Sequence, residues 1–165
     1  VYAVLIDHPE GKILFDTGCN PEGMGDDGRW PEGVQELFPY QASEECYLIN
    51  RLAQLNVRPE DIKYVVASHL HLDHAGCLEL FKNATVIVHD TELSNTMKTY
   101  AINKDMGAYV WADIDQWIKT GVNWKTIMPH EDELELAEGI KILGRDMHGE
   151  CLVYISSCRV KGELF

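Results

Sequence analysis

Basic residues are scarce in this sequence. Its 165 residues include 14 Lys and Arg against 27 Asp and Glu, which gives a formal net charge of −13. Proteins that bind nucleic acid neutralise phosphates with clustered Lys and Arg, and the sequence has no such cluster. The charge therefore disfavours nucleic acid as a partner.

Long apolar runs and paired cysteines are missing as well. The longest apolar stretches resemble residues 1–6 and fall far short of the roughly 18 residues of a membrane span, so we expect no membrane partner. The five cysteines are odd in number and contain no CxxC pair, which favours free thiols in a reducing compartment over a disulfide framework. We therefore expect a cytoplasmic protein. Its 45% hydrophobic content suits one globular domain over residues 1–165.

Apolar runs and turn residues alternate along the chain and predict an α/β (or α+β) fold. A strand hairpin is expected from residues 1–7 and 12–16, with further strands at 64–68, 84–89, 123–128, 133–138, 140–143 and 152–156. Helices are expected over 44–56 with Ser43 as the cap, over 90–106 with Asp90 or Thr91 as the cap, and over 113–120. Residues 17–42 are rich in Gly, Pro and Asp and predict a long irregular loop, a feature that tends to be functional or mobile.

The most informative stretch is Ser-His-Leu-His-Leu-Asp-His-Ala-Gly at residues 68–76, directly after a predicted strand. It places three imidazoles and one carboxylate within six residues. These side chains suit zinc, iron or manganese. If the chain turns after the strand, His69 and His71 can face one ion while Asp73 and His74 face a neighbouring ion. Two ions about 3.5–4 Å apart would form a hydrolytic centre with a bridging water.

This His-x-His-x-Asp-His stretch resembles the signature of the metallo-β-lactamase superfamily. Residues 13–18, Ile-Leu-Phe-Asp-Thr-Gly, resemble the family's strand that ends in Asp-Thr-Gly, and residues 62–68 resemble its strand leading into the metal loop. The resemblance covers roughly residues 1–143 and is greatest to the N-acyl homoserine lactonases, which are quorum-quenching enzymes. It implies an αββα sandwich, mainly its N-terminal half, with a mixed sheet that carries helices on one outer face.

The resemblance also implies an activity and roles for individual residues. The activity would be metal-dependent hydrolysis that opens the lactone ring of N-acyl homoserine lactones, with an acyl lactone as the small-molecule substrate and Zn²⁺ as the cofactor. In a complete site, His69 and His71 would bind one metal and Asp73 and His74 the second. Asp73 would also be the catalytic residue that passes a proton to the leaving alkoxide. Asp16 matches a family residue buried near the metal loop, where it would orient ligands.

Two alternatives to a lactonase stay open. One is another hydrolase of the same superfamily, such as a thioester hydrolase. The other is a non-catalytic, truncated fragment that binds at most one metal. Three aromatic residues bear on the substrate, because they could either line an acyl-chain pocket or pack in the core: Trp30, Phe38 and Tyr40. Four further residues are expected to have structural or solvent-facing positions rather than to bind metal: His8, Cys77, His89 and His130.

Residues 144–165 depart from the family pattern, so we interpret the domain as incomplete at its C-terminus. The family pattern has a metal-binding Gly-His turn after the strand at 140–143 and then a bridging Asp; here His148 lacks the preceding Gly, and no Asp follows Asp146. Codons compatible with residues 144–155, read one base earlier, permit Gly-Pro-Gly-His-Ala-Trp-Gly-Met. We therefore hypothesise a one-base frameshift near Leu143. We expect the chain as written to be inactive, with apolar residues of 1–6 and 13–15 in contact with water.

Overall fold

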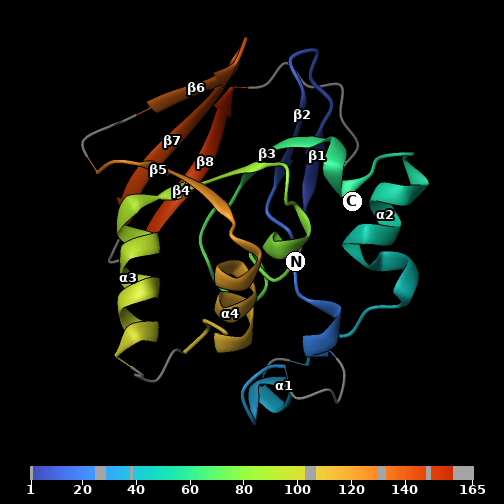
Figure 1. Ribbon diagram of the computed structural model, residues 1–165, viewed down its shortest axis with the longest axis vertical. Coiled ribbons are helices and arrows are strands. Elements are labelled where there is room, and N and C mark those ends of the chain that lie inside the picture. The colour runs from blue at the N-terminus through green and yellow to red at the C-terminus, as the bar shows by residue number, and fades with distance from the viewer. Residues whose placement is uncertain are drawn as a thin grey trace.

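Two β-sheets pack face to face in the computed structural model, which describes residues 2–24, 29–37, 39–102, 107–129, 133–147 and 150–157 (Figure 1). The first sheet is mixed, because its first strand runs antiparallel to the second and all later pairs are parallel. Its strands, in spatial order, are β1 (Val4–Ile6), β2 (Lys12–Phe15), β3 (Ile62–Val66), β4 (Thr85–His89) and β5 (Asn123–Ile127). The second sheet is antiparallel and consists of β6 (Glu133–Ala137), β7 (Ile140–Met147) and β8 (Glu150–Ser157).

The helices and 3₁₀ turns alternate with these strands along the chain. The α-helices are α1 (Val34–Leu37), α2 (Leu48–Gln54), α3 (Asp90–Ala101) and α4 (Trp111–Thr120). Short 3₁₀ turns are η1 (Pro21–Met24), η2 (Glu44–Cys46), η3 (Pro59–Asp61) and η4 (Leu78–Leu80). Helix α4 ends at Gly121, whose φ of 68° is the left-handed conformation that glycine adopts most easily at a helix C-terminus.

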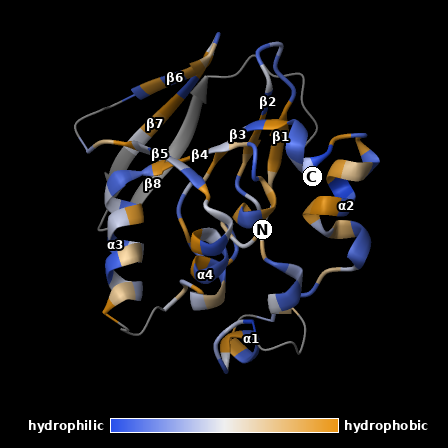
Figure 2. Cartoon of the chain, in the orientation of Figure 1, coloured by the Kyte–Doolittle hydropathy of each residue, from blue (hydrophilic) through white to orange (hydrophobic). Residues whose placement is uncertain are grey.

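The central strands are buried on both faces, which explains why they read as continuous apolar runs (Figure 2). Successive strand residues point to opposite faces, so one set packs toward the helices and the other toward the second sheet. The helix-side core includes Leu14, Val65, Val86, Val88, Leu52, Ile114 and Trp117. The core between the sheets includes Ile13, Val66, Ile87, Ile127, Ala137, Ile140 and Ile142. The expected α/β class, with helices over one face of a mixed sheet, is therefore confirmed.

Apolar residues of 1–6 and 13–15 were expected to meet water; Tyr2 is 64% exposed, but for the core residues of β1 and β2 the expectation is wrong. Leu5, Ile6, Ile13 and Leu14 are each at most 9% exposed. The second sheet covers Ile6 and Ile13, which lie in one buried cluster with its residues Ala137, Ile140 and Ile142.

Two predicted helix starts also need correction. Ser43 makes no side-chain cap; its hydroxyl donates to Glu45, and a 3₁₀ turn precedes α2, which begins only at Leu48. Helix α3 is capped by His89, whose Nδ1 accepts the Thr91 N–H at 3.3 Å. The ring of His89 is therefore structural, as expected. None of the helices among the described residues has the length and apolar character needed to cross a membrane.

Candidate metal centre

The His-x-His-x-Asp-His stretch leaves the first sheet at the carboxyl end of β3. We call residues 67–77 the histidine loop. The carboxyl ends of β2 and β4 lie on either side, so the residues following three parallel strands gather at one edge of the sheet. Open α/β sheets commonly place their functional sites at this edge.

Three predicted ligands meet within this loop. His69, Asp73 and His74 each offer a ligand atom, and these atoms all lie within 4.8 Å of one another. The ring centroids of His69 and His74 are 4.0 Å apart, and the ring of His71 lies beside them, 4.5 Å from that of His69. Imidazole nitrogens and a carboxylate oxygen form a donor set that suits a divalent transition metal. The residues therefore fit a metal ion, although His71 stands beside the three-residue cluster rather than within it.

Asp16 at the end of β2 holds this cluster in place. Its φ of 57° is left-handed, which is uncommon for a residue other than glycine, and the resulting bend follows the last residue of β2. The buried carboxylate accepts the Ser68 N–H at 2.7 Å and the Ser68 hydroxyl at 2.8 Å. It also lies 2.8 Å from Nδ1 of His74. A proton on Nδ1 leaves Nε2 of His74 to face Asp73, 3.4 Å away.

The electrostatics of the cluster favour a cation. Burial and the neighbouring His74 and His71 lower the pKa of His69 to about 3, so this imidazole is neutral and can donate a lone pair. Burial disfavours a charge on His74, but hydrogen bonds to Asp16 and Asp73 outweigh it and raise its pKa to about 9. Burial likewise opposes ionisation of Asp73, yet its hydrogen bond with His74 keeps the pKa at about 2. Two carboxylates thus converge on one imidazole.

The histidine loop is fastened to the segment that follows β2. The Thr17 N–H donates to the His74 carbonyl at 2.7 Å, and the Gly76 N–H donates to the Gly18 carbonyl at 3.0 Å. The Asn20 amide donates to the Gly76 carbonyl at 2.8 Å. A Cβ on Gly76 would lie 2.4 Å from the backbone nitrogen of Asn20, so only glycine permits the two loops to approach this closely. The Asp-Thr-Gly and Ala-Gly sequences therefore serve to join two loops.

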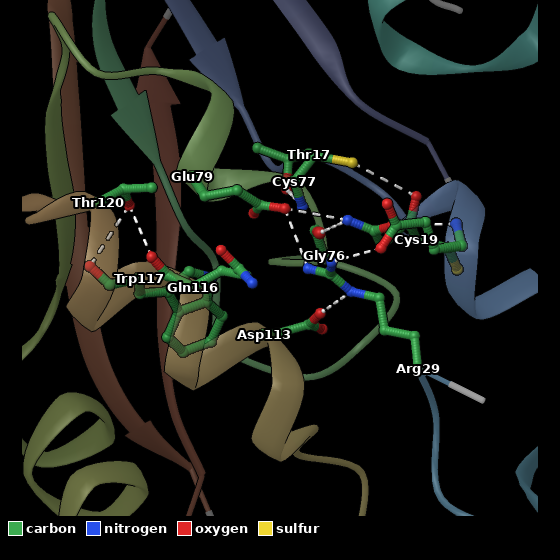
Figure 3. Close-up of polar contacts among 12 residues, drawn as sticks. Thr17, Cys19, Arg29, Gly76, Cys77, Glu79, Asp113, Gln116, Trp117 and Thr120 are labelled. Carbon is green, nitrogen blue, oxygen red and sulfur yellow. Dashed lines mark hydrogen bonds and ion pairs between the residues drawn. The ribbon is translucent and has the colours of Figure 1, made fainter. Parts of the chain in front are cut away.

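A buried arginine connects the long loop, residues 17–42, to the rest of the site (Figure 3). The Arg29 side chain is 8% exposed and donates to Asp113 of α4 at 2.7 Å. It also donates to Glu79 of η4 at 3.0 Å and to Glu22 at 2.9 Å. Burial raises the pKa of Asp113 to about 7, although Arg29 opposes the shift. Sequence reasoning missed this cluster, because a single arginine gives no signal of its partners.

An apolar pocket of about 400 Å³ opens beside the cluster, between the long loop and α2. Its lining includes Ala3, Leu5, Leu14, Met24, Tyr40, Leu48, Leu52 and Leu55. The Tyr40 hydroxyl donates to Asp73 Oδ2 at 3.4 Å, so this side chain touches both the pocket and the cluster. Of the three aromatic candidates, Tyr40 lines the pocket, whereas Trp30 packs in the core with Leu72 and Val110. Phe38 lies outside the described residues.

Two of the remaining candidates, His8 and Cys77, have structural contacts. A ring nitrogen of His8 lies 3.2 Å from the Glu138 carbonyl, in the hairpin turn. Cys77 is buried, its thiol contacts the Cys19 carbonyl at 3.5 Å, and burial raises its pKa, so it is held as a neutral thiol. His130 and His148 lie outside the described residues.

The family is shown by comparison with known proteins. Residues 1–96 match the Metallo-beta-lactamase superfamily, and the chain belongs to that superfamily. N-acyl homoserine lactonase AiiB of Rhizobium rhizogenes is 43% identical over 143 residues, which is 87% of this chain and 52% of the relative. N-acyl homoserine lactonase AiiA of Bacillus thuringiensis subsp. kurstaki is 31% identical over 148 residues, 87% of this chain and 52% of the relative. The chain spans about half the length of the curated relatives it matches.

Solved structures agree with the fold. An N-acyl homoserine lactone hydrolase with the product N-hexanoyl-L-homoserine bound at its catalytic metal centre has a TM-score of 0.70 at 25% identity. The match covers 98% of this chain and 60% of that chain. A B. thuringiensis AiiA mutant with N-decanoyl-L-homoserine bound at the active site gives a TM-score of 0.70 at 26% identity, over 93% of this chain and 56% of that one. The chain therefore has the metallo-β-lactamase fold, matching roughly its N-terminal half.

Proposed function

We propose that these residues belong to a metal-dependent hydrolase that opens the lactone ring of N-acyl homoserine lactones. One observation carries the proposal: a cluster of metal-ligating side chains stands next to an apolar pocket, and Tyr40 contacts both. A cluster alone would suit many hydrolases. An adjoining apolar pocket favours a substrate with a polar reacting group and an acyl chain. The lactonase relatives support the same substrate class.

Zn²⁺ is the proposed metal, with two ions in a complete site. His69, His71, Asp73 and His74 are the proposed ligands, the first two for one ion and the last two for the other. A catalytic zinc takes about three protein ligands plus a water. Four residues give each ion only about two, so the remaining ligands would come from residues outside the described part of the chain.

The bound metal would supply a hydroxide and polarise the lactone carbonyl. Asp73 is proposed to accept the proton that the attacking water loses and to pass it to the alkoxide released when the ring opens, because its carboxylate contacts the Tyr40 hydroxyl, which lines the pocket. The Tyr40 hydroxyl would hold that carboxylate in position. The apolar side chains of the pocket would take the acyl chain, and the −13 charge would repel phosphodiesters.

The test compares the 165-residue chain with a version whose reading frame is restored near Leu143 and continued into the downstream codons. Both are loaded with Zn²⁺ and assayed on N-hexanoyl and N-decanoyl homoserine lactone, an acyl thioester and a phosphodiester. We expect the extended protein to prefer the lactones and the short chain to be inactive. Preference for the thioester would favour the alternative hydrolase. Equal lactone turnover by both chains would refute the frameshift hypothesis and the expected inactivity.

Two variants separate chemistry from folding in this assay. In the extended protein, Asp73→Asn keeps the shape of the side chain but removes the carboxylate that is proposed to transfer the proton and to bind metal, so turnover should fall by about 10²- to 10⁴-fold. His8→Ala changes a histidine of the hairpin turn and should leave turnover unchanged. Full turnover by Asp73→Asn would remove Asp73 from the proposed mechanism.

A further inference from the structure

A buried carboxylate beneath the histidine loop is left unexplained by the proposed reaction. Glu92 lies in the first turn of α3 and is 3% exposed. A carboxylate is costly to bury unless donors satisfy it, and the positive end of the helix dipole helps only in part. Its partners therefore indicate what the side chain does.

The contacts of the Glu92 carboxylate with described residues lead to the candidate ligands. Its Oε1 accepts the backbone N–H of Leu70 at 2.9 Å, and Leu70 stands between His69 and His71 in the chain. The same oxygen accepts the Tyr109 hydroxyl at 3.0 Å. The ring of Tyr109 in turn packs edge-on with the ring of His71, with centroids 4.8 Å apart.

The backbone reinforces this arrangement. The Leu72 N–H donates to the Ala108 carbonyl at 3.0 Å, so the segment before α4 is paired with the histidine loop next to Tyr109. Glu92 thus reaches the loop both directly, at Leu70, and through Tyr109, at His71. Asp16 holds the loop on either side of these contacts, at Ser68 and His74.

We propose that Glu92 and Tyr109 are positioning residues for His71, setting the backbone and ring orientation with which this imidazole binds metal. The inference rests on the proposed metal site, and it concerns the ligand that stands outside the three-residue cluster. Glu92 holds the peptide between His69 and His71, and Tyr109 limits the rotation of the His71 ring. Groups that orient ligands in this way are typically worth 10- to 100-fold in metal affinity.

The experiment measures Zn²⁺ affinity of the full 165-residue chain by competition with a chromophoric chelator, together with the visible spectrum of the Co²⁺-loaded protein. Two variants of Glu92 have side chains of similar length: Glu92→Gln keeps an oxygen that can accept a hydrogen bond, and Glu92→Met does not. We expect Glu92→Met to weaken zinc binding about 10- to 100-fold and to shift the Co²⁺ bands. Glu92→Gln retains an oxygen for the Leu70 N–H and should stay close to the parent in both readouts.

Two further variants keep the inference falsifiable. Tyr109→Phe removes only the hydroxyl that reaches Glu92 and should weaken zinc binding several-fold. Thr96→Val removes a buried hydroxyl from the same helix, one turn beyond Glu92, and should leave zinc affinity and the Co²⁺ spectrum unchanged. A folded Glu92→Met chain that binds zinc as tightly as the parent overturns the inference. If Glu92→Met does not fold, the inference is overturned by a Tyr109→Phe chain that binds zinc as tightly as the parent. Because the readout is metal affinity, this inference is tested separately from the proposed function: an extended protein that binds zinc but opens no lactone would overturn the proposed function and leave this inference standing.

Discussion

The histidine loop and the long loop pack against each other, but they are held by different kinds of contact. The histidine loop is fixed by backbone hydrogen bonds to Thr17 and Gly18 and by the carboxylate of Asp16 at the end of a strand. Beyond Asn20, the long loop is fixed mainly through side chains, above all the guanidinium of Arg29. Metal ligands must keep a narrow geometry, whereas a pocket wall can vary with the ligand. The type of anchor matches the precision that each loop needs.

Replacing Arg29 is the most direct test of how the long loop is held. Arg29→Met would leave Asp113 and Glu79 buried without their cation, and breaking a buried pair in this way costs about 3–5 kcal/mol of the free energy of unfolding. Urea unfolding measures the loss. Arg58→Met is the matched control, since its pair with Asp61 is exposed to solvent and its loss should lower the free energy of unfolding far less. Equal losses in the two variants would show that the cluster is no anchor.

The histidine loop should fail in metal binding before it fails in folding. His74→Ala removes a proposed ligand together with the partner of Asp16, so we expect zinc affinity to fall by more than the roughly 100-fold reached when a supporting group is lost. Elemental analysis and chelator competition measure the change, with His8→Ala as the control. A His74→Ala chain that retains the parental zinc content would exclude His74 as a ligand.

Asp16→Asn is a milder change, and it tests how the Asp16 carboxylate holds the same loop. Asparagine tolerates the left-handed φ of 57° and can still accept the Ser68 N–H, but it cannot hold the proton on Nδ1 of His74 as a carboxylate does. Zinc affinity should fall about 10- to 100-fold with little loss of stability. A large loss of stability with unchanged zinc affinity would make Asp16 a residue of the fold alone.

Much of the architecture could be predicted because its signals are local. The hairpin of β1 and β2 and the buried strands β3 and β4 follow from apolar runs separated by turn residues. The dense motif at residues 68–76 predicts a cluster, and the structure brings together three of its four candidate ligands. Their roles as ligands stay predictions, as does the frameshift near Leu143.

The rest depends on contacts between residues far apart in the sequence. Arg29 and Asp113 are separated by 84 positions, and Leu70 and Glu92 by 22, so no spacing rule pairs them. The cap of α3 was missed because propensity favours Asp or Thr, whereas a buried histidine at the end of β4 takes that place. Burial of the β1–β2 hairpin was missed because it depends on long-range packing of Ile6 and Ile13 in one cluster with Ile140 and Ile142 of the second sheet.

The most gradual expected effect is a pH dependence of the free energy of unfolding, produced by Asp113 at the Arg29 cluster. Burial raises the pKa of Asp113 to about 7, above the value of about 3.9 in an unfolded chain, so the folded state binds this proton more tightly. Its contribution to stability is therefore complete below about pH 4 and is lost as the pH rises toward about 7, at no more than about 1.4 kcal/mol per pH unit. Asp113→Asn removes this titration, so the parent should lose stability relative to the variant over that range in urea unfolding.

Asp61→Asn is the control and should show the opposite sign, because hydrogen bonds with Arg58 lower the Asp61 pKa to about 2 and its contribution to stability is lost as the pH falls. A parent and an Asp113→Asn variant whose unfolding free energies run parallel from pH 4 to 7 would mean that Arg29 keeps Asp113 ionised throughout, and that the long loop is held by a permanent ion pair.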